Sequence, residues 1–123
     1  MAANEYVQAA AGQLQSGATA LKSEADQIRA DFMTYERGAT HEINTKEAEI
    51  HAINAKLLRE QPPETHVSLQ LLARKLQSDV DSKKKEMEQQ RARMNQAVSA
   101  KERAMNDLMN QARGLQSKAG SLK

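Results

Sequence analysis

Apolar residues recur every seven positions through the first half of the chain. The large residues of this repeat are Val7, Leu14, Leu21, Ile28 and Tyr35. A small residue, or in one case a phenylalanine, follows each of them four positions later. Spacings of four and three place such side chains on one stripe of an α-helix, as in the seam of a coiled coil. The pattern predicts a helix over about residues 3–60, with large and small residues alternating along the seam.

The only prolines of the chain, Pro62 and Pro63, stand between this stripe and a second apolar stripe in the other half. Proline cannot donate a helical hydrogen bond, and it pushes the residue before it out of the helical region. The sequence therefore predicts a turn at about residues 61–65 and a second helix over about residues 65–119.

Two arms of nearly equal length predict an all-α fold, a long antiparallel two-helix hairpin that resembles a coiled coil and forms a single domain, 1–123. Residue numbers that face each other should then sum to about 125. Leu69 and Leu72 are also expected at the start of the second stripe. The predicted hairpin seam contains Leu14, Leu21, Ile28, Phe32, Tyr35, Ile43, Ile50, Leu57, Leu76, Val80, Met87, Met94, Met105, Leu108 and Leu115. Two long helices from different chains would use the same seam, so the sequence leaves that alternative open.

The seam is irregular near its middle in both arms. The step from Ala39 to Ile43 adds a four-residue spacing, a stutter that locally unwinds a coiled coil. Gly38 lies beside the stutter, and glycine inside a helix costs about 1 kcal/mol relative to alanine. In the second arm, the spacing places Lys84 and Arg91 at seam positions. We therefore expect Gly38 to act as a hinge and the middle of the hairpin to be its weak point.

Several apolar residues near the prolines lie off the seam. The seam uses one apolar stripe on each helix, and Leu58, Val67 and Leu71 are additional apolar residues outside it. A two-helix hairpin has no thick core and is expected to be marginally stable on its own. We therefore predict that these three residues form an assembly interface, packing the hairpin into a four-helix bundle or a larger helical assembly. Single exposed apolar side chains are also common on ordinary surfaces, so that alternative stays open.

Charge differs between the two halves of the chain. The formal net charge is +2, composed of −3 over residues 1–60 and +5 over residues 61–123. Arms of opposite sign favour pairing with each other. Each exposed ion pair contributes only a few tenths of a kcal/mol, so charge selects orientation while burial supplies stability.

The largest group of basic residues is only a weak candidate for a binding patch. It consists of Lys83, Lys84, Lys85, Arg91 and Arg93. Such a patch could contact phosphate groups or an anionic lipid surface. Acidic neighbours surround it and no aromatic residue interleaves with it, so pairing with Glu36 and Glu42 is the expected outcome. Binding to nucleic acid or a membrane is therefore not the favoured function.

The sequence contains no pattern that carries chemistry. The absence of cysteine excludes a disulfide framework and a thiolate site. None of His41, His51 and His66 has a glutamate three residues before it, as a di-iron helical bundle requires. No glycine-rich phosphate-binding loop is present. We expect no enzyme activity, no catalytic residues, no cofactor and no metal.

The sequence also bears on location. Its first five residues lack the basic start of a secretory signal, and no apolar run follows them. The longest uncharged stretch, residues 6–21, is too polar to span a bilayer. We expect a soluble protein made in the cytoplasm, and export without a signal peptide remains an alternative.

The paired prolines Pro62 and Pro63 between two helical arms resemble the proline-containing turn of type III secretion needle subunits. In size and architecture the chain is also similar to the WXG100 class of secreted helical hairpins. It departs from that class because it has no tryptophan and because Ala10, not an acidic residue, follows Tyr6 by four positions. The resemblance implies a helical hairpin that is exported or assembled.

The combined patterns favour a non-enzymatic structural protein that assembles with itself as a scaffold, filament or bundle subunit. A first alternative is an adaptor, a chaperone or a small exported helical-hairpin protein of a bacterial secretion machine, with another helical protein as partner. A second alternative is a weak binder of nucleic acid or anionic surfaces through residues 83–93.

Overall fold

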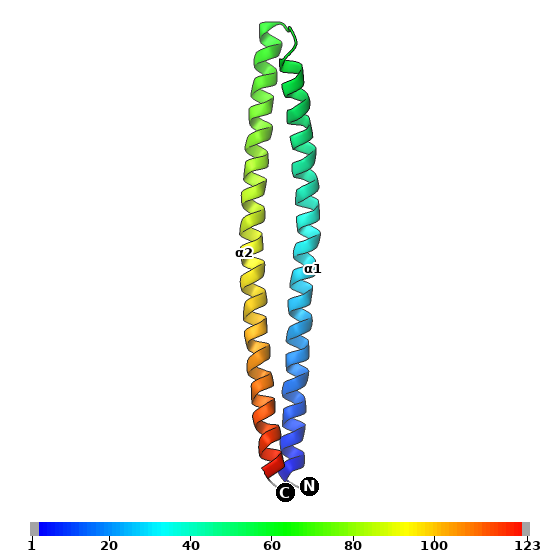
Figure 1. Ribbon diagram of the computed structural model, residues 1–123, viewed down its shortest axis with the longest axis vertical. Helices are drawn as coiled ribbons and strands as arrows, with labels where there is room; N and C mark the ends of the chain where they lie inside the picture. The colour runs from blue at the N-terminus through cyan, green and yellow to red at the C-terminus, as the bar shows by residue number, and fades with distance from the viewer. Residues whose placement is uncertain (1–2, 122–123) are drawn as a thin grey trace. The chain divides into compact units, whose positions relative to one another are not determined.

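The computed structural model describes residues 3–121, and over that range the chain forms two α-helices and no strand. Helix α1 spans Ala3–Leu57 and helix α2 spans Pro63–Ser121. The helices run antiparallel on either side of a short linker (Figure 1). The prediction of an all-α helical hairpin is confirmed.

Helix α1 ends at Leu57, three residues before the predicted boundary. The amide of Leu58 donates to the carbonyl oxygen of Ala55 at 3.3 Å, and the amide of Arg59 donates to that of Lys56 at 3.0 Å. Hydrogen bonds between residues three positions apart tighten the last turn of a helix and are typical of helix ends. Helix α1 therefore finishes before the prolines are reached.

Helix α2 begins at Pro63, two residues before the predicted boundary. Proline suits the first helical position because its missing N–H would have no partner there in any case. The amide of His66 donates to the carbonyl oxygen of Pro62 at 3.0 Å, which makes Pro62 the residue that starts the helical bonding. The Nε2 amide of Gln61 donates to the carbonyl oxygen of Lys56 at 2.5 Å and caps the end of α1.

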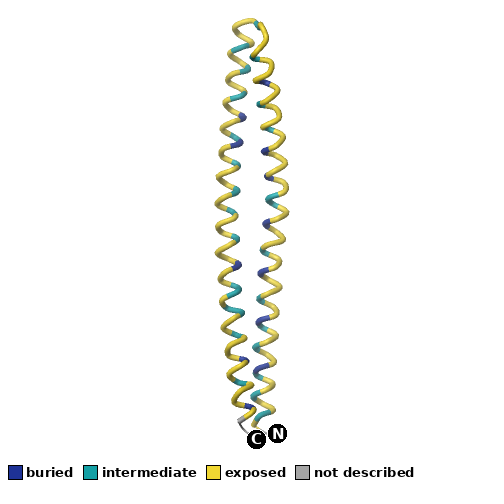
Figure 2. The backbone as a smooth tube through the Cα atoms, viewed as in Figure 1, coloured by how far each residue is buried: buried dark blue, intermediate teal, exposed yellow. Residues whose placement is uncertain are grey.

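Contacts between the helices divide the chain into two units. Unit 1 comprises Met1–Asp31 and Arg93–Lys123, of which the structure describes 3–31 and 93–121. Unit 2 comprises Phe32–Ala92 and contains the linker. In each unit the buried residues lie on the side of a helix that faces the other helix (Figure 2).

The seam of unit 1 is built on small residues. Its buried residues are Ala11, Ala18, Ala25, Val98, Ala112 and Ala119. The larger predicted seam residues are half-buried: Leu14, Leu21, Ile28, Met94, Met105, Leu108 and Leu115. A Cβ atom added at Gly17 would lie 3.1 Å from Cδ1 of Leu108. The small residues let the two helices approach closely, and the larger side chains flank the contact.

The seam of unit 2 is more bulky and contains polar positions. Its buried residues are Phe32, Ala39, Ile43, Ile53, Leu76 and Val80. The half-buried predicted residues are Tyr35, Ile50, Leu57 and Met87. Lys46, Asp79, Lys83 and Gln90 are half-buried as well, and sequence analysis did not place them in the seam.

Two seam predictions in unit 2 are wrong by one residue. The side chains of Lys84 and Arg91 are 51% and 54% exposed, whereas Lys83 and Gln90 are half-buried. After Val80, α2 continues the seam with a step of three residues and not four. A one-residue difference rotates a side chain by about 100° around the helix, which moves it from the seam to its flank.

The predicted antiparallel register is confirmed in each unit. In unit 1, Glu24 pairs with Lys101 at 2.8 Å, and in unit 2, Glu42 pairs with Lys83 at 3.4 Å. Both pairs have residue numbers that sum to 125. The seam contacts described here join the two helices of one chain.

The stutter in α1 does not interrupt the helix. Residues 38–43 are helical, and both Tyr35 and Glu36 are half-buried, so the seam is two residues wide before it resumes at Ala39. A Cβ atom added at Gly38 would meet no atom within 4 Å. The hinge at Gly38 stays a prediction.

Candidate functional site

Four apolar side chains near the linker of unit 2 are exposed, and we call them the tip surface. Leu58 is 90% exposed, Leu71 58%, Val67 52% and Leu72 46%. Leu72 was expected in the seam, but the half-buried Ala73 occupies that position. The three residues predicted as an assembly interface, Leu58, Val67 and Leu71, therefore all remain accessible.

The positions of Val67 and Leu71 on α2 explain their exposure. An α-helix has about 3.6 residues per turn, so residues four apart share a face. By this geometry, Val67 and Leu71 fall on the side of α2 opposite the seam residues Leu69 and Leu76. Helix α1 cannot cover them, and only another chain or segment could do so.

A set of charged side chains occupies the seam of unit 2, and we call Glu42, Lys46, Asp79 and Lys83 the ion-pair layer. The Nζ of Lys46 lies 3.3 Å from Glu42 and 3.7 Å from Asp79. The Nζ of Lys83 lies 3.4 Å from Glu42. The side chains of Lys46 and Lys83 are only 27% and 23% exposed. Each therefore lies mostly against the two helices, with its ammonium group close to carboxylate oxygens.

The ion-pair layer is reciprocal. Each lysine pairs across the seam with the acidic residue that precedes the other lysine by four positions. The repeated spacing of an acidic residue and a lysine, Glu42 to Lys46 and Asp79 to Lys83, is visible in the sequence. Together with the predicted register, this spacing was the signal that could have located the layer.

Aromatic rings lie next to the layer. The hydroxyl of Tyr35 donates to Oε1 of Glu86 at 3.0 Å, and Glu86 also lies 3.7 Å from Lys83. The ammonium of Lys83 lies 5.5 Å from the centre of the Tyr35 ring, a cation–π distance. The Tyr35 and Phe32 rings are 6.1 Å apart, and the Arg91 guanidinium lies 5.2 Å from the Phe32 ring.

These contacts shift three pKa values. The hydrogen bond from Lys46, and then the charge of Lys83, lower the pKa of Glu42. Desolvation acts to lower the pKa of Lys83, but the charges of Glu42 and Glu86 outweigh it and the pKa is raised. Desolvation, followed by the hydrogen bond to Glu86, raises the pKa of Tyr35. At neutral pH all three groups therefore hold the protonation states that their contacts need.

The residues of the predicted basic patch are mostly paired within unit 2. Lys84 lies 3.1 Å from Glu47, and Arg91 forms an ion pair with Glu36. With Lys83 bound to Glu42, the pairing predicted for Glu36 and Glu42 is confirmed. Lys85 and Arg93 are exposed, and within residues 3–121 no ion pair is described for either of them.

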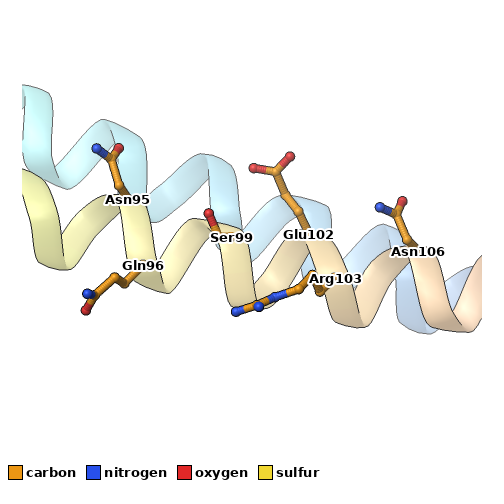
Figure 3. A pocket seen from close by; sticks show the side chains of 6 residues that line it. All are labelled: Asn95, Gln96, Ser99, Glu102, Arg103 and Asn106. Carbon is orange, nitrogen blue, oxygen red and sulfur yellow. The ribbon is translucent and has the colours of Figure 1, made fainter.

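Unit 1 has a polar depression on α2 of about 530 Å³. It is lined by Asn95, Gln96, Ser99, Glu102, Arg103 and Asn106, all from one helix. Figure 3 shows Gln96 and Arg103 on one side of the helix and Asn95, Glu102 and Asn106 on the other. Glu102 pairs with Arg29 at 2.8 Å. Side chains that diverge around a single helix do not enclose a ligand or exclude water.

A second groove in unit 1 is more apolar. It has a volume of about 330 Å³ and is lined by Gln15, Ala18, Thr19, Lys22, Met105 and Met109. Methionine side chains adapt their shape and are frequent at surfaces that bind helices. This groove is the clearest apolar depression among those described in unit 1.

Neither metal binding nor membrane crossing is indicated within the described part of the chain. Among residues 3–121, no group of three or more histidine, aspartate and glutamate side chains is placed to hold a metal ion. His41 and His51 are exposed and His66 is half-buried. No helix over these residues combines the length and the apolar character needed to cross a bilayer.

Comparisons with known proteins do not narrow the function. No family model matches this chain, and the comparison with curated proteins and with solved structures found no match.

Proposed function

We propose that the protein is a non-enzymatic structural protein that associates with further copies of itself through the tip surface. The observation that carries this proposal is the exposure of Leu58 at 90% directly after the end of α1, together with the exposure of Val67 and Leu71 on the outer face of α2 near the same linker. Exposed apolar side chains that gather at one end of a protein are candidates for a contact surface. Covering them removes apolar area from water, which drives association.

Charge near the tip surface does not favour this contact. The charged residues within four positions of Leu58, Val67 or Leu71 are Lys56, Arg59, Glu60, Glu64, Arg74 and Lys75, and all are exposed. Their basic excess opposes the meeting of two tips, so burial of the apolar side chains has to drive association. Such a contact gathers four helical segments, two from each hairpin, into a local four-helix bundle. Symmetric pairing of one surface with itself is also the commonest form of oligomer.

Light scattering after size-exclusion chromatography tests the role of the tip surface. The test variant combines Leu58→Glu with Leu71→Glu, and the expected result is a fall in mass towards the 13.6 kDa of one chain. The matched control combines Asn54→Glu with Ser78→Glu, which adds the same charges at exposed polar positions of unit 2. The control should keep the mass of the parent protein. Equal masses for parent and test variant would refute assembly through the tip.

A binding module for another helical protein is the second candidate function. It is favoured by the groove that Met105 and Met109 line in unit 1. This candidate predicts a monomer whose Met109→Glu variant loses binding to the partner. Contact with nucleic acid through residues 83–93 has less support, because Lys83, Lys84 and Arg91 are already paired with carboxylates.

A further inference from the structure

We infer that the ion-pair layer keeps the middle of unit 2 two-stranded, so that additional copies associate at the tip surface and not along the seam. This limit on assembly rests on the proposed function, because it states where associating copies meet. It also concerns a different part of unit 2, so it can be tested independently.

The layer is only partly removed from solvent. The lysine side chains are 27% and 23% exposed, while Glu42 and Asp79 are 45% and 40% exposed. Each ammonium thus has carboxylate partners at the helix contact, and the carboxylates still contact water. Two helices and the surrounding water are therefore enough to satisfy the charged groups of the layer.

A third or fourth helix laid along the same seam would remove that water. Desolvating a group of ions costs more than their mutual attraction returns unless every remaining hydrogen-bonding group finds a partner. A lysine at a coiled-coil core position is a known determinant of oligomer state, and it acts at a cost in stability. Lys46 faces Asp79 and Lys83 faces Glu42, so two such lysines occupy successive levels of the seam, one helical turn apart.

Over the described residues, the seam nearer the linker contains no lysine or carboxylate. Its residues there are Ile50, Ile53, Leu57, Leu69, Ala73 and Leu76, together with the half-buried His66. Helices of a second copy can therefore cover the region around the tip surface without burying an ion pair. The contrast between these two parts of unit 2 directs association towards the tip.

Replacement of both lysines by methionine tests the inference. Lys46→Met with Lys83→Met keeps most of the side-chain length and makes both lysine positions of the seam apolar, while the carboxylates of Glu42 and Asp79 stay partly exposed to water. The variant is made in the Leu58→Glu and Leu71→Glu background, where tip association is disabled. Sedimentation velocity should show a discrete species of about twice the mass or more, because the apolar seam now accepts further helices.

The matched control replaces Lys56 and Lys85, which are exposed in the same unit, by methionine. It changes composition and net charge by the same amount and should leave the mass unaltered. A second control, Lys46→Arg with Lys83→Arg, keeps the positive charges and should also leave it unaltered. An unchanged mass for the seam variant, or an equal increase in the Lys56 and Lys85 control, would overturn the inference. If the parent protein is itself monomeric, the proposed function fails while this comparison still decides the role of the layer.

Discussion

The Nζ of Lys83 on α2 lies 3.4 Å from Oε2 of Glu42 on α1, and the same carboxylate also lies 3.3 Å from Lys46. One acidic side chain thus joins two lysines that occupy seam positions on opposite helices. The ammonium groups are partly withdrawn from water, so they depend on this carboxylate more than exposed lysines would. Glu42 is therefore the residue on which the ion-pair layer most depends.

Glu42→Gln should lower the melting temperature of the protein. The amide keeps the shape of the side chain but removes the charge that both lysines share. Glu49→Gln is the control, because Glu49 is an exposed acidic residue on the same helix. Thermal unfolding followed by circular dichroism should show a larger decrease for Glu42→Gln. Equal decreases would mean that the layer contributes no more than general surface charge.

The lowered pKa of Glu42 predicts acid sensitivity. A carboxylate whose pKa is lower in the folded state contributes stability above its unfolded pKa, about 4.3, and loses this contribution as the pH falls through its folded pKa. The melting temperature should therefore decline below about pH 4.5. Part of this decline should be missing from the Glu42→Gln variant. A pH profile that is identical in shape for both proteins would contradict the assignment.

Gly38→Ala should stabilise the protein by about 1 kcal/mol, because glycine is the poorer helix former and the added methyl group meets no atom within 4 Å. Gly17→Ala is the informative comparison. Its added carbon lies 3.1 Å from Leu108, which must move to accept it, so the gain should be smaller. Urea unfolding of both variants measures the difference, and an equal or larger gain at Gly17 would refute the close approach in unit 1.

Val80 and Val67 are on the same helix and have opposite roles. Val80 is fully buried, so Val80→Ala should reduce the free energy of unfolding by about 2 kcal/mol. Val67 is 52% exposed, so Val67→Ala should hardly change the stability of a single chain but should weaken self-association. Unfolding at low concentration and light scattering at high concentration separate the two effects. A loss of stability in Val67→Ala with a loss of self-association in Val80→Ala would contradict the placement of the seam and the tip surface.

The helices, the turn and the register could be predicted from sequence because each depends on a repeated signal. Seven-residue spacing defines the seam over many turns, and paired prolines separate the arms. The register then follows from the nearly equal arm lengths. An error of one residue at any single position has little effect on such a pattern.

The middle of unit 2 could not be predicted in the same way because its apolar pattern lapses there. Lys83 and Lys84 are both polar and both pair with a carboxylate of α1, so neither hydrophobicity nor ion pairing selects one of them. The seven-residue step from Leu69 to Leu76 continues to Lys83, but assigning the larger Leu72 to the seam in place of Ala73 broke that regular spacing.

The central claim, association of copies through an exposed apolar tip, is tested most directly by sedimentation velocity of the unmodified protein over a hundredfold range of concentration. We predict a mass above 13.6 kDa that rises with concentration, as expected for reversible association of exposed apolar surfaces. A mass of 13.6 kDa at every concentration would contradict the claim.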